Sequence, residues 1–396
     1  MSDPVSSQIK RVLPEVIAIR HDLHAHPELS QKEHRTSARI REALAKLPGM
    51  NVLPPLIETD VVAILNADRP GPCLALRADI DGLPIHEQSD VPYKSTTPGV
   101  MHACGHDGHT AILLGAAMVL AQRADALPGK VMFIFQPAEE EGGGGGLLCE
   151  RGILESPKVD GAVALHCWPT HRLGIISVNA GPVMAANNSF EITVNGQGGH
   201  GALPHRTVDP IVVAAHVVIA LQSIVSRTVD PLETAVVTVG QIEGGSAVNI
   251  IPDTCRLRGT LRYAQPEVGE HLMGQVHAIA EQTAQAHGAK AEVKIEICYP
   301  PTINDANMTQ VIQDAARELF GPEKLVTNDR FTMGAEDFAF YGQRVPAALF
   351  RLGLCPKDQP TYPGIHHPTF DFNDDALPVG IAMFCEIATR FLAEQG

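Results

Sequence analysis

"GHTAILLGAAMVLAQRADAL", residues 108–127, decides the fold of this chain. The stretch is long, rich in alanine and leucine and free of proline, and it therefore predicts a helix. Short apolar runs lie on either side of it, namely CLALRA (73–78), VMFIFQ (131–136) and AVALH (162–166). Such runs are typical of parallel strands that are covered on both faces. The sequence therefore predicts a βαβ unit within an α/β fold, in which helices flank a mixed, mostly parallel sheet.

A different order of elements begins near Asn187, where SFEITVNG alternates between apolar and polar residues. Four strand-like runs and two longer apolar stretches follow one another there in the order β-α-β-β-α-β. This is the order of a split βαβ, or ferredoxin-like, module. We therefore expect an inserted domain at 187–299, between two parts of the main domain at 1–186 and 300–396.

Composition narrows the class of protein. The chain has 396 residues, of which 44% are hydrophobic and 19% charged, as expected of a globular protein with more than one domain. Its formal net charge of -15 argues against nucleic acid as a partner. The start of the chain is charged by Lys10 and Arg11 and has no long apolar run, so we expect no signal peptide and no membrane span. A cytoplasmic location is therefore the expectation, and the eight scattered cysteines predict free thiols in such a reducing compartment.

Polar residues follow the predicted strands at the points where these strands end. They are two pairs of carboxylates and one imidazole: Asp79 and Asp81, Glu139 and Glu140, and His166. A thiol and further imidazoles lie in the loop before the predicted helix and in a loop near the C-terminus: Cys104, His106, His366 and His367. Because ligands bind at the carboxyl ends of strands in open α/β sheets, we expect these loops to meet in one crevice.

Each of these residues also has an ordinary structural interpretation. Cys104 alone is typical of a buried thiol, and His106 or His109 alone is typical of a helix cap or a solvated imidazole. His166 alone is explained equally well as a hydrogen-bonded core histidine. In combination with the strand-end carboxylates they favour a metal site, since thiolate and imidazole suit zinc and a carboxylate also binds manganese. The glycine run at 142–146 lacks the Lys-Ser or Lys-Thr of a P-loop.

Seven stretches of the sequence resemble motifs of one known family. They are RADIDGLPI, MHACGHDGHTA, FQPAEE, GGHGALPH, VNIIPD, MGAEDFAFY and GIHHPTFDFNDDALP. In this order they are similar to the metallopeptidases of peptidase family M20, and in particular to its amidohydrolase branch, subfamily D. That branch includes hippurate hydrolases, N-acyl-amino-acid deacylases and indole-3-acetyl-amino-acid hydrolases. The resemblance begins at HDLHAHPELS near residue 21 and reaches the C-terminal region, and it implies a zinc-exopeptidase-like sheet with an inserted lid and dimerisation domain.

The resemblance also implies a metal site and its ligands. It implies two divalent ions per subunit, zinc or manganese, with cobalt and nickel as further candidates. The ligands that it implies are Cys104, His106, Glu140, His166 and His366. The chain departs from the family at Glu141, where a glycine is usual, and at His367, where a small polar residue is usual. We therefore assign neither of these two residues a role.

Further roles follow from the same resemblance. Glu139 would be the general base that activates water. His200 and Asn249 would bind the substrate and donate hydrogen bonds to the developing oxyanion, and His200 would do so in the neighbouring subunit. Arg262 would bind the substrate carboxylate. The expected assembly is a homodimer formed through the inserted domain, with a higher homo-oligomer as the alternative.

The function that these observations predict is metal-dependent hydrolysis of an N-acyl or N-aroyl amino acid to a carboxylate and a free amino acid. A dipeptidase or carboxypeptidase activity at the same site is the first alternative. A cysteine hydrolase with Cys104 as nucleophile is a second, but it leaves Glu139, Glu140 and His366 without a role. A noncatalytic binding protein is a third, against which the complete ligand set and base argue. We expect neither nucleic acid nor a membrane as a partner.

Overall fold

The computed structural model describes residues 4–395. Residues 1–3 and 396 lie outside this description. The predicted limits of the main domain at residues 1 and 396, and the first residues of the segment in which we expected no signal peptide, are among them. The chain forms two compact units. The first unit comprises Met1–Gly181, Ile303–Arg330 and Asp337–Gly396, and the second comprises Pro182–Thr302 and Phe331–Glu336.

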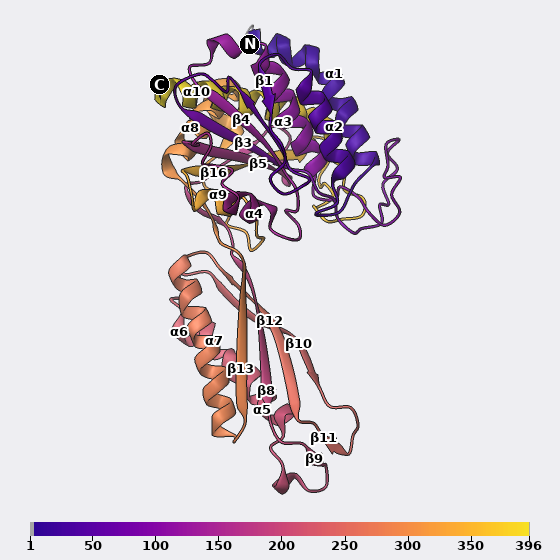
Figure 1. Ribbon diagram of the computed structural model, residues 1–396, viewed down its shortest axis with the longest axis vertical. Coiled ribbons are helices and arrows are strands. Elements are labelled where there is room, and N and C mark those ends of the chain that lie inside the picture. The colour runs from indigo at the N-terminus through magenta and orange to yellow at the C-terminus, as the bar shows by residue number, and fades with distance from the viewer. Residues whose placement is uncertain (1–3, 396) are drawn as a thin grey trace. The chain divides into compact units, whose positions relative to one another are not determined.

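The first unit contains an eight-stranded sheet with the order β1-β2-β4-β3-β5-β16-β6-β15 (Figure 1). Its strands are β1 (Met50–Val52), β2 (Val61–Leu65), β3 (Cys73–Asp79), β4 (Lys130–Gln136), β5 (Gly161–Arg172), β6 (Ile176–Ser177), β15 (Leu325–Val326) and β16 (Ala347–Cys355). The four central strands β4, β3, β5 and β16 are parallel, whereas β1, β2 and β6 each pair antiparallel with a neighbour. The predicted mixed, mostly parallel sheet is therefore confirmed.

Apolar side chains of alternate strand residues cover both faces of this sheet. Val163, Leu165 and Cys167 of β5 pack into one core, whereas Ala162 and Ala164 pack into the other. The first core is closed by α1 (Pro4–Ala25), α2 (His34–Ala45), α3 (His106–Ala121), α8 (Ala306–Phe320) and α10 (Leu377–Gln395). The second is closed by α4 (Gly144–Glu150) and α9 (Ala339–Gly342). Strands buried on both faces explain why the runs are continuously apolar.

The helix predicted at 108–127 begins earlier and ends earlier than its apolar pattern suggested. Helix α3 starts at His106, because Gly105 adopts a left-handed conformation with φ of 88° and ends the preceding loop. It stops at Ala121 and is followed by the short 3-10 turn η1 (Ala124–Ala126). All sixteen residues of α3 are buried. The loop with Cys104 therefore leads directly into the first turn of a core helix.

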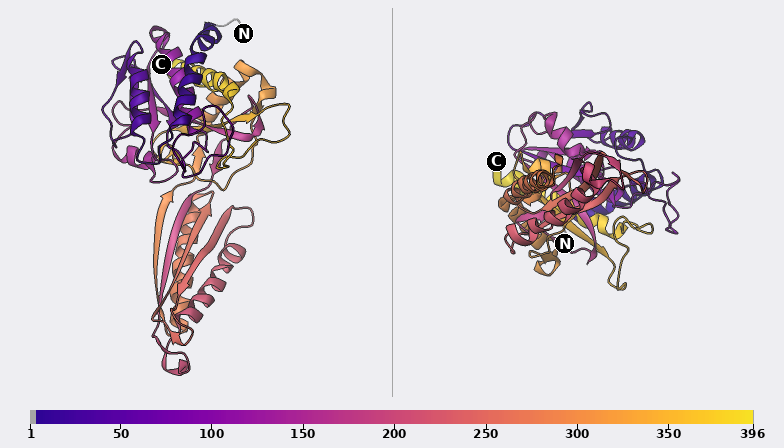
Figure 2. Two further views of the ribbon diagram at one scale, coloured as in Figure 1. Left: turned by 90° about the vertical axis from the view of Figure 1, so that its right-hand side faces the viewer. Right: turned by 90° about the horizontal axis from the view of Figure 1, so that it is seen from below.

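The second unit contains a four-stranded antiparallel sheet with the order β10-β12-β8-β13. Its elements are β8 (Asn187–Asn195), α5 (Pro210–Leu221), α6 (Ser223–Thr228), β10 (Ala235–Gly244), β12 (Thr254–Tyr263), α7 (Pro266–Ala286) and β13 (Lys290–Tyr299). Figures 1 and 2 show helices packed against one face of this sheet, where they close a core of their own. The strand and helix order is the one predicted, except that the first helix is divided at Gln222.

The remaining short elements connect these layers. They are β7 (Gly181–Met184), β9 (Gly199–His200), η2 (Pro204–Arg206), β11 (Ile250–Ile251), β14 (Thr302–Asn304), η3 (Pro322–Lys324) and η4 (Asp374–Ala376). The segment Phe331–Glu336 belongs to the second unit, although we expected the insertion to end at 299. The backbone N–H of Ala185 bonds to the carbonyls of Thr332 and Gly334, at 3.1 and 2.9 Å. These bonds hold the later segment in the second unit.

Within residues 4–395, two helical stretches are long and apolar enough, by length and composition alone, to cross a membrane. In Asp374–Gln395, 67% of the tested window is buried, as expected of a core helix. In Pro210–Thr228 only 28% is buried, and Ile211, Val212 and Ile219 of α5 are exposed. The second unit thus presents an apolar helix surface that its own sheet does not cover.

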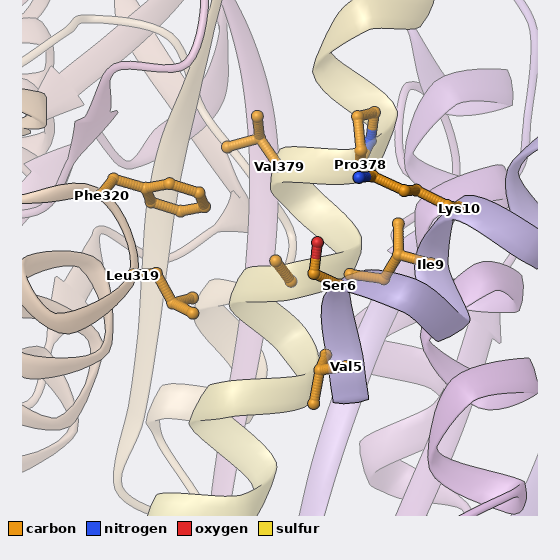
Figure 3. A pocket seen from close by; sticks show the side chains of 9 residues that line it. Val5, Ser6, Ile9, Lys10, Leu319, Phe320, Pro378 and Val379 are labelled. Carbon is orange, nitrogen blue, oxygen red and sulfur yellow. The ribbon is translucent and has the colours of Figure 1, made fainter. Parts of the chain in front are cut away.

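A small apolar pocket lies in the first unit among α1, α8 and α10 (Figure 3). Its volume is about 170 Å³. It is lined by Val5, Ser6, Ile9, Lys10, Leu319, Phe320, Pro378, Val379 and Ala382. None of the residues predicted for the metal site is among them, so this pocket is separate from that site.

Candidate metal centre

The carboxyl ends of the parallel strands bring the predicted ligands together. His166 lies within β5, Glu140 follows β4, and Cys104 and His106 lie at the start of α3. The Cys104 Sγ is 3.5 Å from the His166 Nε2. The Glu140 Oε1 is 3.2 Å from the His366 Nε2 and 3.9 Å from the His106 Nε2. Groups of three among these residues have potential ligand atoms within 4.8 Å of one another, and one such group contains Glu139, Glu140 and His106.

The backbone around these residues adopts conformations that are rare for side chains other than glycine. Ala138 and His366 have φ values of 58° and 63°. The N–H of Ala138 bonds to the Glu33 carboxylate at 2.9 Å, and the N–H of His366 bonds to the carbonyl of Ala103 at 2.7 Å. Left-handed residues of this kind are costly and persist where surrounding contacts hold them, which is frequent at functional sites. The second bond ties the C-terminal loop to the loop that contains Cys104.

Hydrogen bonds to their other ring nitrogens orient two of the histidines. The Nδ1 of His106 donates to Asp81, whose Oδ1 lies at 3.1 Å, and the Nδ1 of His166 donates to the carbonyl of Cys167 at 2.8 Å. Asp81 also accepts the backbone N–H of Glu140 at 3.0 Å. In metal sites such partners fix the tautomer and direct the remaining nitrogen toward the ion. Both Nε2 atoms are therefore available for coordination.

His109, which we also considered from its spacing, is engaged on both sides of its ring. Its Nδ1 donates to Asp79 Oδ1 at 2.6 Å, and its Nε2 accepts the N–H of Cys167 at 2.9 Å. A histidine with both nitrogens bonded in this way has none left for an ion. His109 therefore joins α3 to β3 and β5 instead of completing the ligand set.

The charges around the cluster favour a bound cation. Burial lowers the pKa of His106, but the nearby carboxylates, Asp79 first, outweigh this effect and raise it to about 10. Burial lowers the pKa of His166 to about 3, so this imidazole is neutral. Burial, and then the charge of Glu140, raise the pKa of the Cys104 thiol well above its usual value. Within residues 4–395, the buried His106 Nε2 has no hydrogen-bond partner, and the Glu140 Oε1 faces only the ring nitrogens of His366 and His106. A divalent cation fits this donor set.

A buried network below the cluster fixes the strand ends. The Arg77 guanidinium of β3 pairs with Asp79 and with Asp337, both at 2.8 Å. Asp337 also accepts the N–H of Gly145 at 2.7 Å and thereby holds the glycine run after Glu140. Neither Arg77 nor Asp337 had a predicted role. The sequence did contain one indication of this network. Arg77 is a charged residue within the apolar run CLALRA, and a charge on a buried strand needs a partner of opposite charge.

A second buried network joins two ligand-bearing loops. Arg20 of α1 is fully buried and donates to Asp107 at 2.8 Å and to Asp371. Asp107 directly follows His106, and Asp371 lies in the loop that continues from His366. This network was not predicted. Arg20 directly precedes the stretch HDLHAHPELS (21–30), but no local pattern there indicates its partners Asp107 and Asp371.

The three predicted substrate-binding residues lie in the second unit. His200 in β9 pairs with Ile250 of β11, and the N–H of Gly201 bonds to the carbonyl of Asn249 at 2.8 Å. His200 and Asn249 are therefore neighbours, and both are exposed. Arg262 is near the other end of β12 and donates to the carbonyl of Met333 at 3.4 Å.

The separation of these residues within one copy is large. Eight residues of extended strand separate Thr254, at the start of β12, from Arg262, which corresponds to about 26 Å. The Asp253 side chain next to Thr254 accepts the N–H of Gly198 at 2.9 Å, so the β9–β11 pair lies at that start. The structure thus brings His200 and Asn249 together but keeps them apart from Arg262. His367 is exposed and bonds only locally, to Thr369 at 2.8 Å.

A mixed sheet whose carboxyl edge gathers a thiol, imidazoles and carboxylates is an α/β protein with a candidate metal site. The family model for peptidase family M20/M25/M40 matches residues 75–390, and the chain belongs to this family.

Individual relatives indicate the branch of the family to which the chain is most similar. It is 39% identical to the N-acetyl-L-cysteine deacetylase of Bacillus subtilis, over 99% of this chain and 91% of that protein. It is 37% identical to the IAA-amino acid hydrolase ILR1-like 4 of Arabidopsis thaliana, over 96% of this chain and 86% of that protein. A solved Bacillus subtilis structure, a dinuclear metal-binding peptidase of family M20, shares 35% identity and a TM-score of 0.85, and covers 97% of this chain and 99% of its own. The resemblance is confirmed, and the chain is a hydrolase of the amidohydrolase branch.

Proposed function

We propose that this protein is a metal-dependent amidohydrolase that cleaves N-acyl or N-aroyl amino acids to a carboxylate and a free amino acid. The observation that carries this proposal is the cluster of Cys104, His106, Glu140, His166 and His366, with Glu139 beside it at the end of a buried strand. The relatives named as a deacetylase and an amino acid hydrolase act on the class of bond that such a site would cleave.

The five clustered residues would hold two divalent cations, with zinc or manganese as the first candidates and cobalt or nickel as further ones. Such ions, when bound, polarise an amide carbonyl and make water acidic enough to attack it near neutral pH. The unpartnered Nε2 of His106 supports this assignment, because a buried polar atom without a partner is costly.

Glu139 would act as the general base. Its carboxylate is buried, and the left-handed conformation of Ala138 holds the turn on which it lies. We propose that it takes a proton from the attacking water and gives it to the leaving amine, so that one carboxylate serves both steps. His200 and Asn249 would donate hydrogen bonds to the developing oxyanion, and Arg262 would bind the substrate carboxylate.

The structure bears on the alternative with Cys104 as nucleophile. A nucleophilic cysteine needs a lowered pKa, whereas burial and Glu140 raise the pKa of this thiol. A buried Cys104 thiolate would need a neighbouring cation to stabilise its charge, and the proposed metal ions would provide one. The alternative of dipeptidase or carboxypeptidase activity uses the same site and differs only in the substrate.

We also propose that the protein is a homodimer formed through the second unit. If His200, Asn249 and Arg262 act at one small substrate, they must come from two copies, because about 26 Å of strand separates them in one copy. Ile211, Val212 and Ile219 offer an exposed apolar surface on α5 for such an association. We place the enzyme in the cytoplasm, a location supported by its eight cysteines, all of which are free.

One experiment tests the proposed reaction. The metal content of the purified protein is measured before and after chelation, and hydrolysis of N-acetyl, N-benzoyl and indole-acetyl amino acids and of dipeptides is followed in parallel. We expect about two divalent ions per chain, with hydrolysis that is lost on chelation and restored by zinc or manganese. Activity that survives complete removal of the metal would contradict the mechanism, and cleavage of dipeptides alone would favour the alternative.

A further inference from the structure

Trp168, the only tryptophan of the chain, lies two residues beyond His166 on β5. Residues two apart on a strand point to the same face, so Trp168 continues the face that carries the metal-site imidazole. The two rings are 6.1 Å apart and meet edge to face. Part of the Trp168 surface is exposed, although the other residues of this strand up to Cys167 are buried. A large aromatic surface is therefore open beside the predicted ligands.

A buried arginine holds the indole ring in place. Arg351 of β16 is the register partner of His166, and its Cζ lies 4.1 Å from the centre of the Trp168 ring. Asp329 accepts from Arg351 at 2.7 Å, and His171 and Ser177 contact the same carboxylate at 2.7 and 2.9 Å. Because the guanidinium is fixed from behind, the ring that stacks on it is fixed as well. A fixed aromatic side chain loses little entropy when a ligand packs against it.

This arrangement offers a substrate an apolar surface and not a charge. Arg351 is only 5% exposed and is paired with Asp329, so its positive charge is not available to a substrate carboxylate. Burial by itself raises the pKa of Asp329, but Arg351 and His171 outweigh this effect and hold the pKa far below its usual value, so the pair stays ionised. The exposed partner for a ligand is the indole ring itself.

We propose that Trp168 is a specificity-determining residue that binds the acyl group of the substrate and favours flat aromatic acyl groups over acetyl. This inference rests on the proposed function, whose scissile amide would lie at the cluster next to His166. Arg262, which is expected to bind the carboxylate of the amino acid half, belongs to the second unit, as do His200 and Asn249, which are expected at the scissile carbonyl between the two halves. The exposed aromatic surface of Trp168 belongs to the first unit, and we assign it to the acyl half of the substrate.

The test compares W168A and W168F with the wild-type metal-loaded protein on N-benzoyl and N-acetyl derivatives of one amino acid. Aromatic contacts of this kind justify an expected loss of about tenfold in kcat/KM for the benzoyl substrate in W168A. The acetyl substrate should change less than twofold, and W168F, which keeps a flat apolar ring, should recover most of the benzoyl activity. Metal content should equal that of the wild type in both variants.

The outcomes separate this inference from the proposed function. An equal loss on both substrates, or a loss that follows the amino acid side chain when the acyl group is held constant, overturns the role of Trp168 while the amidohydrolase assignment stands. A metal-loaded wild type that hydrolyses neither of these two substrates nor any other N-acyl amino acid overturns the proposed function itself.

A binding measurement covers the case in which W168A does not fold. Since Trp168 is the only tryptophan, the tryptophan emission of the wild-type protein reports on this one position. Titration with benzoate, the product of the benzoyl substrate, should change the emission saturably, whereas acetate at the same concentration should not. Benzoate that leaves the emission unchanged would overturn the proposal.

Discussion

Among single residues, Glu139 and Glu141 form a natural pair for a test, because both are glutamates of the same turn but only Glu139 is buried. We expect E139Q to keep its metal and its fold but to lose roughly 100-fold to 10,000-fold in kcat, because an amide of the same shape cannot accept a proton. E141Q should keep the wild-type rate. The measurements are kcat and metal content by mass spectrometry. Wild-type turnover in E139Q would remove Glu139 from the mechanism.

Substitution of Cys104 tests whether its thiol is a metal ligand or a nucleophile. If the thiolate binds the metal, C104D should retain part of the metal and a measurable residual activity, because a carboxylate also binds these ions. If the thiol attacks the substrate, the same variant should be inactive, and a covalent acyl-enzyme should form on the wild-type Cys104. Intact-protein mass spectrometry after rapid quenching checks this. A trapped acyl group on Cys104 would refute the metal mechanism.

Several site residues that the sequence predicted lie near the carboxyl ends of apolar strands. Glu140 follows β4, whereas the strand expected to end at His166 continues to Arg172. Their position relative to one another follows from the rule that parallel strands end at one edge. The supporting residues could not be found in this way. Arg77 pairs with Asp337, 260 residues later, and Arg20 pairs with Asp371, 351 residues later. No local pattern reveals which buried charge meets which partner.

Among the elements, the first turn of α3 depends on a glycine that no other residue can replace at low cost. Gly105 has φ of +88°, and a Cβ there would lie 2.7 Å from the Cys167 Sγ. Gly99 has a similar φ of +77° but no atom within 4 Å of such a Cβ. We expect G99A to lower the free energy of unfolding by about 1 kcal/mol and G105A by about 3 kcal/mol or more.

Chemical denaturation of both variants checks this prediction, and metal affinity gives a second reading. Because Gly105 lies between Cys104 and His106, G105A should also weaken metal binding, whereas G99A should not. Equal destabilisation of the two variants would show that only the backbone conformation matters at Gly105 and that contact with Cys167 does not.

Helix α1 is joined to α3 by a histidine whose charge depends on pH. Burial lowers the pKa of His24, but Asp107, whose carboxylate is 2.9 Å away, outweighs this and raises it to about 9. The folded state thus binds this proton more tightly than the unfolded state does. The resulting stabilisation, of up to about 3 kcal/mol, is complete below about pH 6.5 and is lost as the pH rises through 9.

The prediction is a difference between two proteins. The free energy of unfolding of the wild type minus that of H24Q should fall between pH 6.5 and pH 9.5. Taking the difference cancels the other titrating groups, including His106. A difference that stays constant over this range would show that His24 is neutral in the folded protein.

The elements themselves were predicted well where their pattern is local. The parallel strands and the order β-α-β-β-α-β follow from apolar runs and their lengths. The break between α5 and α6 at Gln222 was not predicted, because the apolar pattern continues through it. The attachment of Phe331–Glu336 to the second unit depends on hydrogen bonds to Ala185, almost 150 residues earlier in the chain, and has no counterpart in the local sequence.

For the whole molecule, the position of His200 leads to a prediction about assembly. His200 and Asn249 lie together in the second unit, about 26 Å of strand away from Arg262. One copy therefore cannot supply all three residues to one small substrate. In the proposed two-fold dimer the partner would supply what is missing, because each copy would give the other the same residues.

A mixture of two inactive variants tests this assembly. E139Q lacks the base, and H200A lacks the donor that would serve the partner's site. In a heterodimer of the two, the site on the H200A chain has its own Glu139 and receives His200 from the E139Q chain, so it is complete. The other site lacks the base. Random pairing makes half of all dimers mixed, with one working site in two, so the mixture should recover roughly a quarter of the wild-type activity.

The same mixture distinguishes the shared site from a site within one chain. If His200 acted in its own chain, each chain of the heterodimer would lack one essential residue, and mixing would restore nothing. Subunit exchange is verified by native mass spectrometry of the mixture, so that an inactive mixture can be interpreted. An inactive mixture with exchange confirmed, or full activity of the wild-type protein as a monomer in sedimentation at assay concentration, would show that the partner's His200 is not needed and would refute the shared site.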